Sequence, residues 1–182
     1  MAVTDAAFNS DTASAGPVNG VIANAIGVVN SFVPSDRANL NTDGISVLRD
    51  INGQTMLYGY QTLSTSPIFQ DAGPARLRMQ LVYNCQQILQ TFLFADIDGR
   101  GHLFAAIAGA LTDYLNSLWK QGALYGATPS QAFSVNTGPA VNTPITIAAR
   151  QVNAAVSARL SPTAEMITLN ITAYAVNQSI AA

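Results

Sequence analysis

Apolar residues recur at intervals of three and four positions in two long segments near the middle of the chain. The first segment follows Pro74, a residue that the opening turn of a helix tolerates, and the second follows a Gly-rich stretch over residues 96–101. The apolar positions are Leu77, Leu81, Cys85, Ile88, Leu89 and Phe92 in the first segment, and Phe104, Ile107, Leu111, Leu115 and Leu118 in the second. This spacing predicts two amphipathic helices, and the short connection predicts that they pack antiparallel.

A β-hairpin is predicted before the helices. Residues 45–49 and 54–60 are strand-like and flank Asn52-Gly53, which is the strongest short hairpin signal in the chain. Ser35-Asp36 is typical of a helix cap, so a single helical turn is expected over residues 35–41. The N-terminal half is therefore expected to contain mostly strand and loop.

Strands are also predicted after the helices. Residues 131–136 form one, and residues 145–159 form a long or broken one after a turn at 142–144. The clearest strand pattern covers Met166–Tyr174, where apolar and polar residues alternate strictly. Ile167, Leu169, Ile171 and Ala173 are expected on one face, and Thr168, Asn170, Thr172 and Tyr174 on the other.

The domain organisation follows from length and pattern. A chain of 182 residues can bury one sizeable core. We expect an extended N-terminal arm over residues 1–20, a core domain over 21–165 and a C-terminal strand or arm over 166–182. The predicted fold class is α+β, with a mixed sheet packed against the two long antiparallel helices.

The composition indicates a surface that other subunits cover. Hydrophobic residues make up 49% of the chain but charged residues only 10%, against roughly 25% in typical soluble domains. Lys120 is the single lysine and Glu165 the single glutamate. A monomer normally carries many such residues to stay in solution, so assembly is the favoured interpretation and a poorly charged monomer the alternative.

Several partners and compartments are disfavoured by the sequence. The net charge is −2 with no basic run, which argues against direct binding of nucleic acid. No apolar run approaches the roughly 18 residues of a membrane helix, and no secretory signal precedes the first basic residue, Arg37. A single cysteine, Cys85, fits a protein made in a reducing cytoplasm.

The residues that usually carry chemistry are scarce. His102 is the single histidine and lies at the predicted start of the second helix, whereas Cys85 lies on the apolar face of the first. One Cys and one His cannot build the usual zinc sites, and Asp96-x-Asp98 lacks the later ligands of a calcium loop. We therefore expect no enzyme activity, cofactor or metal. An enzyme built on Asp residues is the contrasting hypothesis, and it predicts an acidic pocket and a stable monomer.

Five short blocks occur in order along most of the chain. They are Ala15–Gly20, Leu40–Arg49, Tyr58–Ser64, Leu115–Gly126 and Pro162–Ile171. The second is similar to a "leucine, then Gly-Ile-Asn-Val-Ile-Arg" stretch, and the third to "Trp-Gly-Ala-Arg-Thr-Leu-Ser", both found in the C-terminal domain of contractile tail sheath proteins. The chain thus resembles the sheath family of phage tails and related injection machines.

The chain departs from the family pattern at several points. Tyr58 and Tyr60 stand where Trp and Ala are usual, and Gln54 replaces the common Gly-Arg-Gly approach to the second strand. Family members also carry additional outer domains before this one. A chain of 182 residues has little room for such domains, which puts the N-terminal linking arm in doubt. The chain resembles a minimal sheath, a shortened relative or the final domain of a longer chain.

The resemblance implies a structural subunit with no substrate. Such subunits form stacked rings or a helical sheath around an inner tail tube protein, between a baseplate and a tail terminator. Arms from neighbours add strands to the sheet, which implies a donor role for Ile167, Leu169, Ile171, Ala173 and Tyr174. Contraction then moves rigid subunits and drives the tube through the target envelope.

The resemblance leaves two further expectations. Arg76, Arg78 and Lys120, the sparse cations of the two helices, are candidates to face the tube. The protein is expected to be made in the bacterial host cytoplasm and to act in the virion tail or a phage-like injection particle. The alternative role is a non-contracting cap, terminator or accessory tail protein with the same fold.

Overall fold

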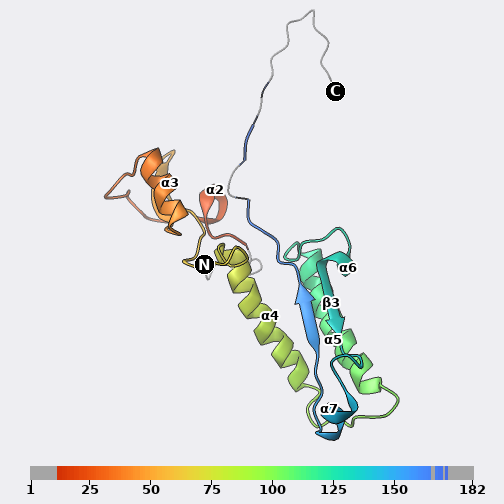
Figure 1. Cartoon of the computed structure of the whole chain (residues 1–182). Coiled ribbons are helices and arrows are strands. Elements are labelled where there is room, and N and C mark those ends of the chain that lie inside the picture. Colours follow the sequence, from red (N-terminus) through yellow and green to blue (C-terminus); the bar gives the residue numbers. More distant parts are fainter. Residues whose placement is uncertain (1–11, 165–166, 170, 172–182) are drawn as a thin grey trace, which may run out of the picture.

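The computed structural model describes residues 12–164, 167–169 and 171, and its elements follow one another from an N-terminal lobe to a long helix pair (Figure 1). The elements in chain order are α2 (Gly16–Asn19), α3 (Pro34–Thr42), β1 (Val47–Ile51), β2 (Gln54–Tyr58), α4 (Ala72–Gln90), α5 (His102–Lys120), α6 (Pro129–Ala132), β3 (Phe133–Asn136), α7 (Pro144–Ala148) and β4 (Ala155–Ala158). The predicted α+β class is confirmed.

The two long helices are present and run antiparallel, as predicted (Figure 1). The start of α5 is fixed by Asp98, whose Oδ1 accepts a hydrogen bond from the His102 N–H at 2.9 Å. At the other end Gly122 adopts a left-handed φ of 85°, and the Ala123 N–H donates to the Leu118 carbonyl at 3.1 Å. A left-handed glycine is a common helix terminator because it lacks the Cβ clash of other residues.

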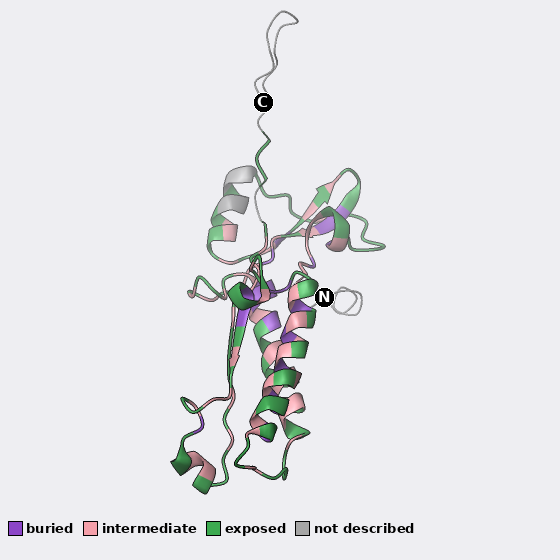
Figure 2. Cartoon of the chain, turned by 90° about the vertical axis from the view of Figure 1, so that its right-hand side faces the viewer, coloured by how far each residue is buried: buried purple, intermediate pink, exposed green. Residues whose placement is uncertain are grey.

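The hydrophobic core lies along one face of α5. Leu111 and Leu115 are fully buried, and Leu77 of α4, also fully buried, packs in the same cluster as Leu115. Figure 2 shows buried residues inside the helix pair and exposed residues on its outer surfaces. A second cluster around Leu103 and Ile107 takes in Cys85, Ile88 and Leu89 of α4. All but Leu103 belong to the apolar stripes predicted from spacing; Leu103 is buried where Phe104 was expected, and Phe104 is only half-buried.

The predicted mixed sheet is wrong. The described residues form two separate antiparallel sheets of two strands each, β1–β2 and β3–β4. The hairpin at Asn52-Gly53 is confirmed, with φ values of 52° and 76° that match the type I′ turn. Because each strand of β1–β2 pairs with its immediate chain neighbour, this hairpin does not depend on strands from the C-terminal half.

The predicted long strand over residues 145–159 is also wrong. Its first part is the helix α7, capped by Thr143, whose Oγ1 accepts a hydrogen bond from the Thr146 N–H at 3.3 Å. Pro144 occupies the first helical position, where its missing N–H costs nothing. Only Ala155–Ala158 forms a strand, β4, which pairs with β3 from Phe133↔Ala158 to Asn136↔Ala155.

The expected N-terminal arm is partly packed. Residues 16–19 form the helical turn α2 instead of an extended chain. The segment that follows joins β2, since the Leu57 N–H donates to the Gly20 carbonyl and the Ile22 N–H to the Thr55 carbonyl, both at 2.9 Å. Residues 1–11 lie outside the described residues.

The predicted C-terminal strand is unpaired at its described residues. Ile167, Leu169 and Ile171 belong to no strand and have exposed fractions of 90%, 78% and 81%. In Figure 1 the chain leads away from the helix pair beyond β4. Ala173 and Tyr174 lie outside the described residues.

Candidate functional site

An apolar groove with a volume of 830 Å³ lies between α4 and β4. Figure 1 shows these two elements diverging from the end where the helices are connected. One face of α4 lines the groove with Arg78, Leu81, Val82, Cys85, Gln86 and Leu89, and the loop before α4 adds Pro67, Ile68 and Phe69. The three- and four-residue spacing on α4 is the spacing of one helix face.

The opposite wall of the groove is β4 and the chain just beyond it. Alternate residues line the groove there, together with Arg159: Ala154, Val156, Ala158, Leu160 and Pro162. Side chains two apart on an extended chain share a face, so this wall is one face of the strand. The high alanine content makes the wall shallow and leaves room beside α4.

One edge of β4 is already paired. β3 covers its first part, and the pairing continues as the Arg159 N–H donates to the Ala132 carbonyl at 2.8 Å. The Tyr125 N–H then donates to the Arg159 carbonyl at 2.9 Å, and the Ser161 N–H to the Ala123 carbonyl at 3.0 Å. These contacts fix which residues of this strand point toward β3.

The other edge of β4 is open. Because backbone groups of successive residues alternate between the two edges, Val156, Ala158 and Leu160 direct their N–H and C=O groups away from β3. The described residues place no strand on that side. The groove therefore combines apolar walls with a row of unpaired backbone groups, which is the arrangement that binds an additional strand.

Asp71, Arg78 and Arg159 are the charged residues that line the groove, and Cys85 is its thiol. Burial raises the pKa of the Cys85 thiol, which keeps it protonated at neutral pH. Outside the groove lining, burial also raises the pKa of Tyr114, which packs against the core and whose hydroxyl accepts a hydrogen bond from Asn84 Nδ2 at 2.9 Å. Cys85 thus has the environment of a structural thiol and not of a nucleophile.

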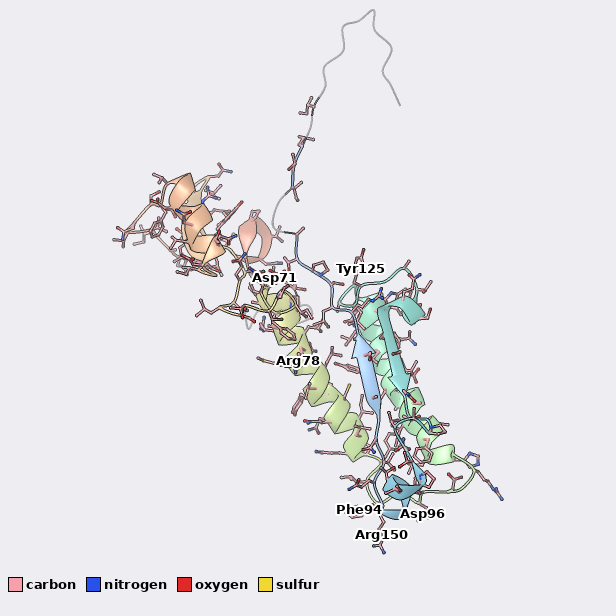
Figure 3. All side chains as sticks on the ribbon, viewed as in Figure 1. Asp71, Arg78, Phe94, Asp96, Tyr125 and Arg150 are labelled. Atoms are coloured by element: carbon pink, nitrogen blue, oxygen red, sulfur yellow. The ribbon has the colours of Figure 1, made fainter. Side chains whose placement is uncertain are left out.

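The predicted tube-facing cations have different surroundings. Arg76 Nη1 donates to the Tyr60 hydroxyl at 3.0 Å, and the Arg78 guanidinium lies 5.2 Å from the centre of the Phe69 ring. Lys120 ends α5 and lines a second cavity with Arg159 and neighbouring residues. Figure 3 shows Arg78 near the beginning of α4, far from the opposite tip marked by Phe94 and Arg150.

The predicted donor residues begin where the groove ends. Pro162 is the last groove-lining residue, and Ile167, Leu169 and Ile171 follow it within nine positions. Sequence reasoning identified these residues but missed the acceptor groove. The available signal was the alternation from Ala154 to Leu160, which resembles the spacing of a strand with one apolar face.

The described residues offer no built site for metal chemistry. They contain no group of three His, Cys, Asp or Glu residues that could hold a metal ion. His102 lies with its Nε2 3.8 Å from Asp98 Oδ2 in the loop that caps α5. In the described part of the chain, no helix is both long enough and apolar enough to cross a membrane.

The fold is that of known contractile sheath structures. The PVC sheath complex of an extracellular contractile injection system, in its contracted state, matches with a TM-score of 0.83 and 23% identity over 93% of this chain. The anti-feeding prophage helical sheath in its contracted state and the six-fold symmetrised anti-feeding prophage baseplate match with TM-scores of 0.80 and 0.81, each at 24% identity over 93% of this chain.

The similarity lies in structure and not in overall sequence. This chain spans 47% of the length of each of these three matched chains. No family model and no curated protein sequence matches it. The resemblance to sheath proteins that the short sequence blocks indicated is therefore confirmed at the level of the fold.

Proposed function

We propose that this chain is a structural subunit of a contractile sheath, which polymerises by strand exchange around an inner tube and contracts to drive the tube through a target envelope. The observation that carries the proposal is the apolar groove beside the open edge of β4 on a sheath fold. Such a subunit binds neighbouring copies and needs no catalytic residues.

The proposed donor is the C-terminal segment of a neighbouring subunit. Ile167, Leu169 and Ile171 are exposed and alternate with polar residues, so a strand made from them would direct all three side chains into one groove. Burying three such side chains contributes roughly 5–9 kcal/mol before the cost of ordering the segment. The backbone groups of Val156, Ala158 and Leu160 would gain partners at the same time.

The amount of exposed surface supports assembly. Among the described residues, large apolar side chains are exposed on the helix pair and on the loops around it. Met79 and Tyr83 on α4 and Phe94 at the tip are large apolar residues among those exposed. A surface with this much apolar area and few charges is typical of a protein that other subunits cover.

The remaining partners follow from the sheath role. Arg76, Arg78 and Lys120 are proposed to face an inner tube protein, because α4 begins at the end of the helix pair where α5 finishes. Baseplate and terminator proteins would bind the two ends of the assembly. Contraction would proceed as a rigid-body rearrangement of subunits joined by their arms. The proposal also holds that the protein is synthesised in a bacterial cytoplasm and acts in a phage-like particle.

The test is electron microscopy of the purified protein, alone and with its neighbouring tube protein. We expect striated cylinders from the natural sequence and dispersed particles from the triple variant Ile167→Asp, Leu169→Asp, Ile171→Asp, because three carboxylates cannot enter an apolar groove. Thr168→Asp, on the opposite face of the segment, is the matched control and should still assemble. Cylinders formed by the triple variant would refute strand donation by this segment.

A non-contracting baseplate or cap subunit is the second candidate. It is favoured by the similarity to anti-feeding prophage baseplate structures, one of them in the contracted state. A cap would form a single closed ring, whereas a sheath would form a long cylinder. The same micrographs therefore separate the two roles.

A further inference from the structure

We propose that the connection between α4 and α5, residues 91–101 (the tip), docks into the second cavity of another copy of this chain. Phe94 and Asp96 of the tip enter the cavity, which lies at the far end of the helix pair beside Tyr125 and Arg159. The inference rests on the proposed function as a polymerising subunit, and it adds a contact between copies that is separate from the groove at β4.

The cavity that would receive the tip has aromatic walls. Its volume is 810 Å³, and Trp119 and Tyr125 are among the residues that line it. The size falls within the range of about 300–1,000 Å³ that is usual for binding pockets. The indole of Trp119 is held in place because its Nε1 donates to the Gly126 carbonyl at 2.9 Å. Such walls suit an aromatic or apolar guest.

The same cavity carries positive charge that nothing balances. Lys120 and Arg159 are its charged residues, and no carboxylate is among the described residues that line it. Neither cation has an ion-pair partner in the described part of the chain. The backbone of Arg159 is fixed, since its carbonyl accepts from the Tyr125 N–H at 2.9 Å. A guest with a carboxylate would supply the missing partner.

The tip holds a large aromatic side chain away from the body of the subunit. Phe94 has an exposed fraction of 102% and a left-handed φ of 66°. Helix ends usually place glycine in this conformation, because bulky side chains disfavour it. The Ala95 N–H donates to the Phe92 carbonyl at 3.2 Å and holds the turn. An aromatic ring exposed at a conformational cost is accounted for by a partner that receives it.

The tip also carries a free carboxylate two residues after the ring. Asp96 is exposed and has no hydrogen-bond or ion-pair partner among the described residues. Asp98 differs, because its Oδ1 accepts the hydrogen bond that caps α5. Phe94 and Asp96 together thus match the aromatic walls and the unbalanced cations of the cavity. Arg100 and Arg150, which lie at the same end, are outside the docked residues.

The two surfaces lie at opposite ends of the subunit. Figure 3 shows Tyr125 at one end of the helix pair, and Phe94 and Asp96 at the other. A contact between different surfaces of two copies is head-to-tail, and its repetition gives a closed ring or an open helical filament. The docking contact would therefore join copies along the direction of the helix pair.

Cross-linking between two chains tests the docking directly. One chain carries Ala95→Cys beside Phe94, and the other carries Ala127→Cys at the border of the cavity, both in a Cys85→Ala background. These alanines are exposed, and their replacement leaves the proposed docking residues unchanged. The matched control replaces the second chain by one with Ala106→Cys, which is exposed on α5 outside the cavity lining. The mixtures are oxidised with oxidised glutathione at the highest concentration that stays in solution.

We expect the disulfide between positions 95 and 127 to form about tenfold or more in excess of the one between 95 and 106, because docking brings the first pair within disulfide distance. Equal yields for the two mixtures would overturn the inference. Circular dichroism of the Cys85→Ala chains establishes that they are folded.

Charge reversal in the natural chain is the second measurement and does not depend on replacing Cys85. Asp96→Arg and Arg159→Asp should each lower the average mass of assemblies measured by sedimentation, because each places like charges together. The two changes combined should restore it. Asp113→Arg, at an exposed carboxylate in the middle of α5, is the control and should leave assembly unchanged. Failure of the combined variant to recover would contradict the proposed pairing.

The outcomes separate this inference from the proposed function. If the natural chain forms cylinders and the 95–127 disulfide shows no preference, the sheath role stands and docking of the tip is wrong. If the disulfide is preferred and neither cylinders nor rings form, docking stands and the sheath role is wrong.

Discussion

At the residue scale, Cys85 reports on the groove between α4 and β4. It is the single thiol of the chain and lines the groove, where it also packs beside Leu103, Ile107 and Leu111. Its position was predicted from helical spacing, and its protonated state follows from burial. Neither property gives it a catalytic role, but together they make it a natural probe of groove occupancy.

Cys85 should be alkylated with a pH profile whose midpoint lies above the ordinary thiol pKa of 9.0, because burial raises its pKa and only the thiolate reacts. The same rise in the pKa of Cys85 makes the free energy of unfolding depend on pH. The raised pKa contributes stability that is fully present below the unfolded-state pKa and is lost as pH rises through the folded-state pKa. Iodoacetamide kinetics between pH 7 and 10 measure the midpoint, and a value below 9.0 would contradict the assignment.

At the element scale, the hairpin and the two long helices depend on residues that are close together in the sequence. The hairpin β1–β2 depends on Asn52 and Gly53, whose positive φ values place both residues in a type I′ turn. The helices α4 and α5 depend on apolar stripes and on the break over residues 96–101. By contrast, α7 replaced a predicted strand because Thr143 and Pro144 form a helix start that outweighs the following β-branched residues.

Replacing Gly53 with alanine should destabilise the protein by about 1–2 kcal/mol, because alanine resists the left-handed conformation. The added Cβ would meet nothing within 4 Å at Gly53, so the cost is conformational and not steric. Gly99→Ala is the matched control, since its Cβ also meets nothing and its φ is not left-handed. Urea unfolding should show destabilisation in the first variant and none in the second; equal effects would refute the turn assignment.

At the scale of the whole molecule, the chain resembles part of an assembly more than a self-sufficient globule. In the described part of the chain, the two sheets have two strands each, and one sheet has an open edge beside an apolar groove. The matched structures of similar fold are sheath and baseplate assemblies. An open sheet edge and an apolar groove are the features that the proposed assembly with neighbouring subunits would cover.

A chain truncated after Ala164 should act as a terminator of assembly. If the groove accepts a neighbour's strand as proposed, this truncated chain can still accept one but cannot donate one. Added in increasing proportion to the full chain, it should shorten the cylinders seen by electron microscopy, whereas the same amount of additional full chain should not. Unchanged cylinder length would show that residues 165–182 are dispensable for growth.

The sequence by itself determined the features that depend on near neighbours along the chain. The spacing of Leu77 and Leu81 on α4, and of Leu111 and Leu115 on α5, is a local property, as is the Asn52-Gly53 turn. The scarcity of charge and of residues suited to catalysis is a property of composition, which needs no fold to be recognised, and it indicates assembly.

The tertiary structure decided which strands pair and where a groove remains. The choice of two small sheets over one mixed sheet depends on contacts such as Phe133↔Ala158 and Leu124↔Leu160, which join distant segments. The groove exists because α4 diverges from β4, an angle that no local pattern encodes. The alanines of β4 have small side chains that impose little preference for helix or strand. The contacts with surrounding elements therefore decide that this stretch forms a strand.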